Sequence, residues 1–415
     1  MPLSVQLAGN EVCGFCLDSI GSVVKSSWRR MTTALVLSYW NLNDPRTGGL
    51  QRVNALLDAI GSGVTLCQPG DPHPQFNTVP LKLDLGRRKR IINWGMFNFF
   101  WPANSKLVHG LIEKEKPSVI VLTSTWAFAP LREHHDIPIV LDAHDVNAVA
   151  IGERYGVRHP FTTLVRRWEA RVVQRANHVF ACSDVDRAKF IELYGVPGEK
   201  VSVAPNGIDV PESIDEIESV PIPQEYEEKL KDSTALLFVG GMGYQPNRKA
   251  FDLLNSVIMP ELERKYPGQY RLVICGGTPP GQIHPSIVVV GRVDDALLRG
   301  YLKRADMCLA PITTGSGTRL KILEYMAARR LVIATPKGAE GLACEHGKDI
   351  VIAEPDAFCD SIVELASDPD RARALAEMGY KLVSERYDWD VAAKPVWRDV
   401  LGRWLDVDGK GSVEK

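Results

Sequence analysis

Short runs of apolar, β-branched residues alternate with longer helical patterns along the whole chain, and this alternation restricts its possible folds. In the first half the runs are Thr33–Ser38, Gly63–Cys67, Ser118–Thr123, Ile137–Ala143 and His178–Ser183. In the second half they are Thr234–Gly241, Arg271–Gly277, Ser286–Gly291, Ala305–Pro311 and Arg330–Thr335. Continuously apolar strands are covered by helices on both faces, which is typical of parallel sheets. The sequence therefore predicts an α/β protein with doubly wound sheets.

The length of 415 residues predicts two such domains, because single hydrophobic cores rarely grow beyond ~250–300 residues. Two open sheets that face each other are expected to form a cleft at the carboxyl ends of their strands, where ligands of such folds bind. The alternation lapses between Asn206 and Pro223, where the chain becomes acidic and proline-bearing. Apolar residues at helical spacing near the chain end predict a helix that packs back on the body. The expected divisions are a poorly ordered leader (1–32), a first Rossmann-like domain (33–210), a linker (211–229), a second Rossmann-like domain (230–385) and a C-terminal helix and tail (386–415).

Composition argues against several classes of protein. The formal net charge of −2 gives no bulk electrostatic reason to expect a nucleic-acid partner. No segment approaches the ~18 uninterrupted apolar residues that span a bilayer, and the chain start lacks the pattern of a secretory signal. The eight cysteines lie mostly in apolar runs, as reduced thiols do, which favours the cytoplasm. Cys13 and Cys16 form an isolated CxxC without the second pair that zinc requires.

The segment GSGTRLKILEYM (315–326) joins a strand to a helix, so its loop is expected at the carboxyl edge of the second sheet. Thr318 is the expected N-cap. The free amides of the first turn would then be those of Arg319, Leu320 and Lys321. Cations at a helix start oppose the helix dipole unless an anion lies in front of them, so the segment predicts a phosphate site. From the residues alone, a solvated helix face behind a glycine turn is the alternative.

Glu324 lies one turn into the same helix, and helical side chains lean towards the helix start. Its carboxylate is therefore expected to accept hydrogen bonds from hydroxyls beside the phosphates, such as those of a ribose.

A second glycine-rich turn, FVGGMGYQPNRK (238–249), follows the first strand of the second domain. Arg248 and Lys249 open the helix after it, so a phosphate contact and a tight turn with solvated basic residues are both open. The turn lacks the dinucleotide fingerprint GxGxxG with its acidic partner, which disfavours a nicotinamide oxidoreductase.

Two clusters in the first domain also follow strands. DPRTGGLQRV (44–53) places Gly48 and Gly49 before a helix, which makes a third phosphate-compatible turn. LDAHDVNA (141–148) ends a strand with His144 inside a polar cluster. A lone histidine is often structural, but this position makes His144 a candidate for the site.

Together these motifs resemble glycosyltransferase family 4, also called glycosyl transferases group 1, which has the two-domain GT-B fold. The most specific stretch is GSGTRLKILEYMAARRLVIATPKGAEGL (315–342). Residues 238–267 and 179–209 support it. The resemblance runs from about Thr33 to Leu401, to a branch with the motifs GxGTRLKxLE and GxMxYxPN.

This resemblance implies that the second domain binds a nucleotide-sugar, with Glu324 on the ribose hydroxyls. It implies diphosphate contacts from the amides of Thr318, Arg319 and Leu320. His144 matches a histidine near the transferred sugar and is the expected catalytic residue. The expected donor-binding residues are Gly48, Gly49, Asn247, Arg248, Ser316, Gly317, Thr318, Arg319, Leu320, Lys321 and Glu324.

Two departures from the family pattern affect the donor site. Ser316 stands where the family commonly has a glutamate that contacts the sugar, and Gly241 stands where an arginine is common. The basic residues that remain for the diphosphate are Arg248, Lys249, Arg319 and Lys321.

The chemistry expected from these residues is metal-independent and needs no cofactor. Amides and cations at a helix start stabilise the charge that develops on a leaving diphosphate. No DxD-like pair lies at a suitable strand end, and no second carboxylate suggests a two-step mechanism. By resemblance the transfer retains the anomeric configuration, with front-face attack and assistance from His144.

The acceptor is expected to be a sugar or a lipid-linked molecule. GRRKRIINWGMFNFFW (86–101) combines basic and aromatic residues, which suits peripheral contact with an anionic membrane on its inner face. A core segment with a solvated turn is the alternative. Two other functions stay open: a nucleotide-sugar epimerase of the same fold, and a non-catalytic nucleotide-sugar-binding subunit, which Ser316 favours. The sequence does not identify the base, the sugar, the acceptor or the oligomeric state.

Overall fold

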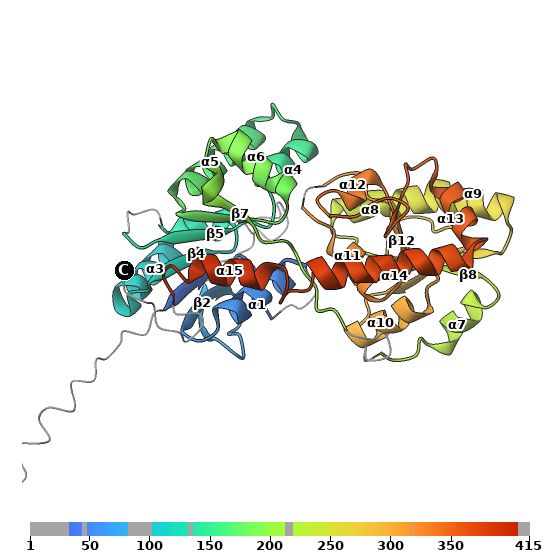
Figure 1. Cartoon of the computed structure of the whole chain (residues 1–415), viewed down its shortest axis with the longest axis horizontal. Coiled ribbons are helices and arrows are strands. Elements are labelled where there is room, and N and C mark those ends of the chain that lie inside the picture. The colour runs from blue at the N-terminus through green and yellow to red at the C-terminus, as the bar shows by residue number, and fades with distance from the viewer. Residues whose placement is uncertain are drawn as a thin grey trace, which may run out of the picture.

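The computed structural model describes residues 33–43, 48–81, 102–131, 136–211, 219–315 and 317–405. Two parallel sheets lie side by side in the molecule, one in each half of the chain (Figure 1). The first is seven-stranded, in the order β3-β2-β1-β4-β5-β6-β7. The second is six-stranded, in the order β10-β9-β8-β11-β12-β13.

The strands of the first sheet are β1 (Ala34–Leu37), β2 (Val64–Pro69), β3 (Asn77–Leu81), β4 (Val119–Leu122), β5 (Ile139–Asp142), β6 (His178–Ala181) and β7 (Val201–Val203). Those of the second are β8 (Thr234–Val239), β9 (Tyr270–Cys275), β10 (Ile287–Gly291), β11 (Met307–Ala310), β12 (Leu331–Ala334) and β13 (Val351–Ile352). Every predicted strand is present. The sequence prediction missed β3, β7 and β13, which are short or half-exposed sheet margins with a weak apolar signal.

The helices of the first half are α1 (Gly48–Ile60), α3 (Pro102–Glu115), η1 (Thr125–Leu131), α4 (Asn147–Tyr155), α5 (Pro160–Arg175), α6 (Asp184–Tyr194) and η2 (Gly198–Lys200). Those of the second are α7 (Gln224–Leu230), α8 (Gln245–Leu253), η3 (Leu254–Ile258), α9 (Met259–Lys265), α10 (Asp295–Arg304), α11 (Leu320–Ala327), α12 (Pro336–Ala339), α13 (Phe358–Ala366) and α14 (Pro369–Arg386). The last helix is α15 (Ala393–Leu401).

Both faces of each sheet are buried, as the continuous apolar runs predict. Along β1, Leu35 and Leu37 belong to one core cluster, whereas Ala34 and Val36 belong to the cluster on the opposite face. The strands of the second sheet are likewise shared between two core clusters. The chain is therefore the predicted α/β protein with doubly wound sheets.

The chain end returns to the first half of the molecule. After α14 it crosses over, and α15 packs against α1 and β7 (Figure 1). Trp397 is fully buried there, beside Trp389. The expected domain boundaries stay a prediction, and the leader and tail lie outside the described residues. Among the described helices, none is both long and apolar enough to cross a bilayer.

Candidate functional site

The glycine loop before α11 lies against the first half of the molecule. The Gly315 amide donates to Glu153 Oε2 of α4 at 2.8 Å, and the Asn206 side-chain amide donates to Thr318 Oγ1 at 2.7 Å. Gly317 has φ +74°, and a Cβ there would overlap the carboxylate of Asp145. Only glycine fits this position. The predicted phosphate loop is therefore held at the junction of the two halves; Ser316 within it lies outside the described residues.

The start of α11 differs by one residue from the prediction. Arg319, not Thr318, is the N-cap residue, and no side chain caps the helix. The Thr318 hydroxyl instead accepts the bond from Asn206, a partner far away in sequence. The first-turn amides of Leu320 and Lys321 have no partner within the helix, so they remain donors of the kind that binds anions.

Lys321 is a half-buried lysine in this first turn. Its Nζ donates to Asn247 Oδ1 at 2.7 Å and lies 4.4 Å from the centroid of the Phe238 ring. Burial lowers the pKa of Lys321 to about 7. Arg319 is buried, and its guanidinium donates to the carbonyls of Gly315 and Gly317. Arg319 therefore stabilises the loop. The charged form of Lys321 is disfavoured by desolvation, and its ammonium lies beside the free amides of the first turn.

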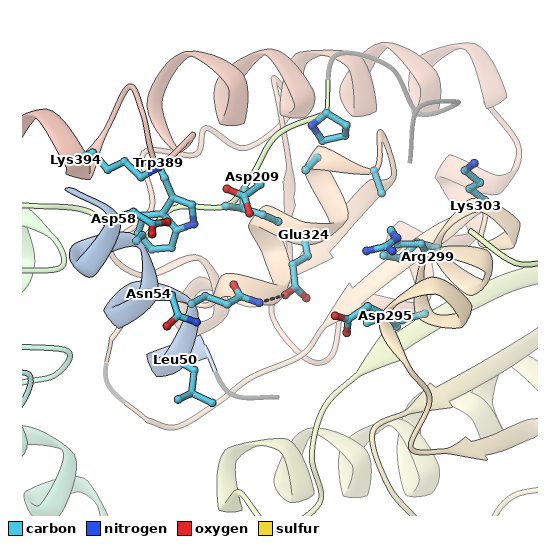
Figure 2. Close-up of a pocket in the computed structure, with 18 residues that line it drawn as sticks. Leu50, Asn54, Asp58, Asp209, Asp295, Arg299, Lys303, Glu324, Trp389 and Lys394 are labelled. Carbon is cyan, nitrogen blue, oxygen red and sulfur yellow. Dashed lines mark hydrogen bonds between the residues drawn. The ribbon is translucent and has the colours of Figure 1, made fainter. Parts of the chain in front are cut away.

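Glu324 lines a cavity of about 640 Å³ between the two halves (Figure 2). One wall comes from α1, including Gln51 and Asn54, and the other from α10 and α11. Gln51 Nε2 lies 3.5 Å from Glu324 Oε1, at the limit of a hydrogen bond, and burial raises the pKa of Glu324. The Asn54 side-chain oxygen is buried without a hydrogen-bond partner among the described residues. Cavities of this size accept small molecules such as a nucleoside.

His144 lies beside the glycine turn of the first half. Its ring stacks on Trp40, with centroids 4.4 Å apart, and its Nε2 lies 3.3 Å from Asp142 Oδ2. A Cβ on Gly49 would come within 3.3 Å of His144 Nδ1 and 3.2 Å of Trp40. Burial lowers the pKa of His144, against the opposing effect of Asp142, so the ring is neutral near pH 7.

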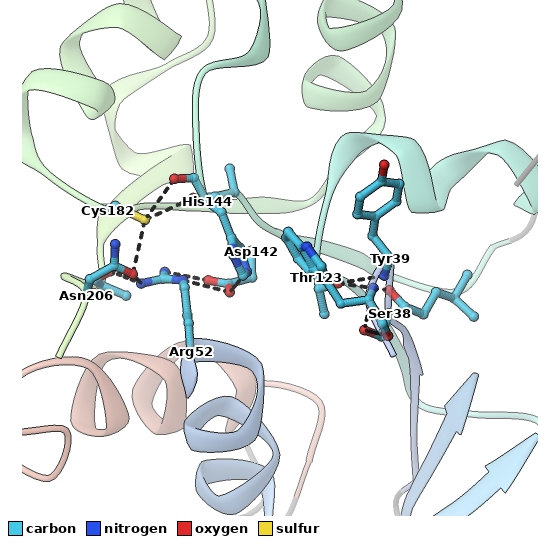
Figure 3. A network of polar contacts seen from close by, with 12 residues as sticks. Ser38, Tyr39, Arg52, Thr123, Asp142, His144, Cys182 and Asn206 are labelled. Atoms are coloured by element: carbon cyan, nitrogen blue, oxygen red, sulfur yellow. Dashed lines mark hydrogen bonds and ion pairs between the residues drawn. The ribbon is translucent and has the colours of Figure 1, made fainter. Parts of the chain in front are cut away.

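A buried network runs from His144 through Asp142 and Arg52 to Asn206 (Figure 3), and it continues to Thr318 of the glycine loop. Arg52 binds both carboxylate oxygens of Asp142, at 2.6 and 2.9 Å, and both side chains are fully buried. Burial would raise the pKa of Asp142, but Arg52 holds it at about 2. The other side of the guanidinium donates to the Ala204 carbonyl and to Asn206 Oδ1, and Asn206 in turn reaches Thr318.

Sequence reasoning predicted a cleft between the two sheets but missed Arg52 and Asn206 as residues of the site. One signal for Arg52 was available: it occupies the apolar stripe of α1 next to Val53 and Leu56, both fully buried. A charge at such a position needs a buried partner. Asn206 gave no such signal, because its partners Arg52 and Thr318 come from remote parts of the chain.

Two predicted donor residues are placed differently from one another. Asn247 is buried against Lys321, whereas Arg248 is exposed and lines a separate hollow of about 400 Å³ with Arg292 and Gly277. Asn147 of the polar cluster does not enter the cleft, since its side chain donates to Thr125 and Glu169. Gly48 begins α1, and the segment 86–101 lies outside the described residues.

The architecture defines the class of the protein. The sucrose-phosphate synthase of Thermosynechococcus elongatus superposes with a TM-score of 0.70 at 17% identity, over 90% of this chain and 100% of that one. Anabaena HepE, solved in complex with UDP, superposes with a TM-score of 0.65 at 15% identity, over 89% and 100%. The chain has the GT-B fold of two Rossmann-like domains.

Family models then identify the family. The model for Glycosyltransferase Family 4 matches residues 54–212, and that for Glycosyl transferases group 1 matches residues 233–368. The chain belongs to this family, as the motifs predicted.

Two curated relatives are more similar in sequence than those structures. Phosphatidyl-myo-inositol mannosyltransferase of Mycolicibacterium smegmatis is 24% identical over 268 residues, covering 61% of this chain and 64% of that protein. D-inositol 3-phosphate glycosyltransferase of Thermobispora bispora is 27% identical over 248 residues, covering 54% and 56%. The chain thus spans less than two thirds of the length of the curated relatives it matches.

Proposed function

We propose that this protein is a glycosyltransferase that moves a sugar from a nucleoside-diphosphate sugar to an acceptor. The observation that carries the proposal is the continuity of three features. Glu324, which lines the cavity, lies one helical turn after the first-turn amides of α11, and the half-buried Lys321 belongs to that first turn. His144 lies across the junction and is linked to Thr318 through Asp142, Arg52 and Asn206. The names of relatives agree with it, since one is a mannosyltransferase and one structural neighbour holds UDP.

The donor is proposed to lie along these features in order. The nucleoside occupies the cavity with its ribose hydroxyls on Glu324, and the diphosphate meets the amides of Leu320 and Lys321 together with the Lys321 ammonium. The sugar then reaches the turn at Gly49, beside His144. Gly48, Ser316, Gly317, Thr318 and Asn247 complete the proposed donor side. The donor contact of Arg248, which lines a separate hollow, stays a prediction.

The proposed chemistry is a retaining, metal-independent transfer. The bond from C1 of the sugar to the phosphate oxygen breaks while the bond from C1 to the acceptor oxygen forms on the same face. The acceptor proton passes to the leaving phosphate. The α11 amides and Lys321 stabilise the charge that develops on that phosphate. One such donor lowers the activation barrier by about 3 kcal/mol. Neutral His144, aligned by Asp142 and Trp40, donates a hydrogen bond to a sugar oxygen or accepts one from a sugar hydroxyl.

The acceptor is proposed to be lipid-linked or a saccharide. Phosphatidyl-myo-inositol, in the name of one relative, is a lipid, and D-inositol 3-phosphate, in another, is a soluble cyclitol. An epimerase would release no nucleoside diphosphate, and a binding subunit would turn over no donor. Acceptor-dependent release of nucleoside diphosphate therefore separates transfer from both alternatives.

A thermal-shift screen against nucleoside diphosphates and nucleotide-sugars tests the donor site. At a ligand concentration of about 100 Kd, binding stabilises the folded protein by about 2.7 kcal/mol, which raises the melting temperature by several degrees. Glu324→Ala should abolish most of that shift. Asp370→Ala, an exposed carboxylate on α14 far from the cavity, is the matched control. An undiminished shift in the Glu324 variant would contradict the placement of the ribose.

A further inference from the structure

The α4–α5 hairpin exposes large apolar side chains at its tip. The exposed fractions are 44% for Tyr155, 77% for Val157 and 62% for Leu164. The Tyr155 ring packs edge-on to Phe161, with centroids 5.7 Å apart, so the two aromatic side chains of the tip contact each other. A single exposed apolar residue is normal on a protein surface, but three within one hairpin indicate a contact.

Arginines surround these apolar residues. Arg154 lies over the Tyr155 ring at 5.2 Å, and Arg158 is exposed in the connecting loop. On α5, Arg167 and Arg171 follow Leu164 at spacings of three and seven residues, which places them on one helical face. Both are exposed. The tip therefore presents apolar and cationic side chains together.

No carboxylate within these two helices is available to neutralise the arginines. Their acidic residues are Glu153 and Glu169. Glu153 accepts from the Gly315 amide and pairs with Lys337 of α12 at 2.9 Å. Glu169 is fully buried and accepts from Tyr194 and from the amides at the start of α4. Within these two helices the arginines therefore outnumber the available carboxylates, and the hairpin presents net positive charge.

We propose that the α4–α5 tip, defined by Tyr155, Val157, Leu164, Arg158, Arg167 and Arg171, docks on an anionic lipid bilayer. Anionic headgroups attract the arginines, while the apolar side chains enter the boundary between headgroups and acyl chains. A bilayer suits the tip because it offers negative charge and apolar depth over a continuous surface. Glu153 on the same helix contacts the glycine loop, so docking brings the rim of the proposed active site to the membrane.

Vesicle co-sedimentation of the full chain tests the proposal. Wild type should bind phosphatidylcholine vesicles that contain phosphatidylglycerol, bind pure phosphatidylcholine far less, and dissociate as salt is raised. Reversal of the three arginines (R158E/R167E/R171E) should lower the partition coefficient by about a hundredfold or more, because each basic residue contributes about fivefold. V157S/L164S keeps the charge and should weaken binding by removing the apolar insertion.

A matched control reverses three exposed basic residues on α14, remote from the tip: R371E/R373E/K381E. This variant should bind vesicles nearly as wild type does. Vesicle binding that survives R158E/R167E/R171E would place the membrane contact elsewhere and overturn the proposal, as would the absence of binding by wild type or capture of an acidic protein without vesicle binding. The thermal shift with nucleoside diphosphate should be the same in R158E/R167E/R171E and wild type, so failure of this proposal is distinguishable from failure of the proposed function.

Discussion

The two halves of the molecule place charged side chains at the proposed active site in opposite ways. We call the side formed by Arg52, Asp142 and His144 the first wall, and the side formed by Lys321 and Glu324 the second wall. On the first wall Arg52 and Asp142 satisfy each other without a ligand, and they align His144. On the second wall burial lowers the pKa of Lys321 to about 7 and raises that of Glu324, so both charged states are disfavoured before anything binds. A satisfied network rigidifies a site, whereas disfavoured charges bind a complementary ligand.

This comparison teaches where stability and function are expected to separate. Removing one partner of a satisfied buried pair leaves an uncompensated charge and destabilises the fold. Removing a disfavoured charge maintains or raises the free energy of unfolding of the ligand-free protein, and it weakens only the binding of the ligand. Substitutions on the two walls should therefore differ in which measurement they change.

The largest effect is expected on the first wall. Arg52→Met should lower the free energy of unfolding by about 3–5 kcal/mol, because Asp142 would remain buried and ionised without its partner. Urea denaturation measures this. Glu324→Gln, on the second wall, should leave that free energy unchanged or slightly higher. Equal losses in the two variants would refute the comparison.

Lys321→Met should separate activity from stability most clearly. We expect the turnover number to fall about 100- to 1,000-fold, since one donor to the leaving phosphate is removed. The free energy of unfolding should be maintained, because the disfavoured charge disappears. Steady-state kinetics with the donor saturated measure the first quantity. Lys381→Met, at an exposed position on α14, is the control; a loss of turnover no greater than in that control would remove Lys321 from the proposed mechanism.

A smaller effect is expected at the link between the walls. Thr318→Val deletes the oxygen that accepts from Asn206, whereas Thr318→Ser keeps it. Valine should raise the Kd for nucleoside diphosphate by about fivefold to tenfold, the range of one hydrogen bond lost with its buried donor unpaired. Isothermal calorimetry on the two variants decides it. If valine and serine bind alike, the link does not support the loop.

The smallest effect is a change in proton uptake. The pKa of Lys321 lies near 7 in the folded protein and near its ordinary value in the unfolded chain, so the unfolded state binds more protons between these values. Stability should therefore rise with pH from about 7 towards 10. Diphosphate binding should recharge the lysine and take up a fraction of a proton at about pH 8, measurable by calorimetry in buffers of different ionisation enthalpy. Uptake that persists in Lys321→Met would assign it to another group.

Much of the fold could be predicted because its signal is local. Buried strands such as Val119–Leu122 are apolar at each position, and the glycine loops mark where a strand ends and the next helix begins. The N-cap of α11 could not be predicted to the residue, because Thr318 is a good capping residue whose hydroxyl is occupied by Asn206. The segment 86–101 stays a prediction.

The sequence by itself determined the two doubly wound sheets, the family and the candidate loops at the strand ends, since apolar periodicity and glycine turns act over a few neighbouring residues. Only the tertiary structure decided that Arg52 of α1 pairs with Asp142 at the end of β5, 90 residues further along the chain. It also decided that the cavity opens between α1, α10 and α11. Burial also set the pKa shifts of Lys321 and Glu324, because desolvation depends on every segment packed around a charge and not on the residues beside it in the chain.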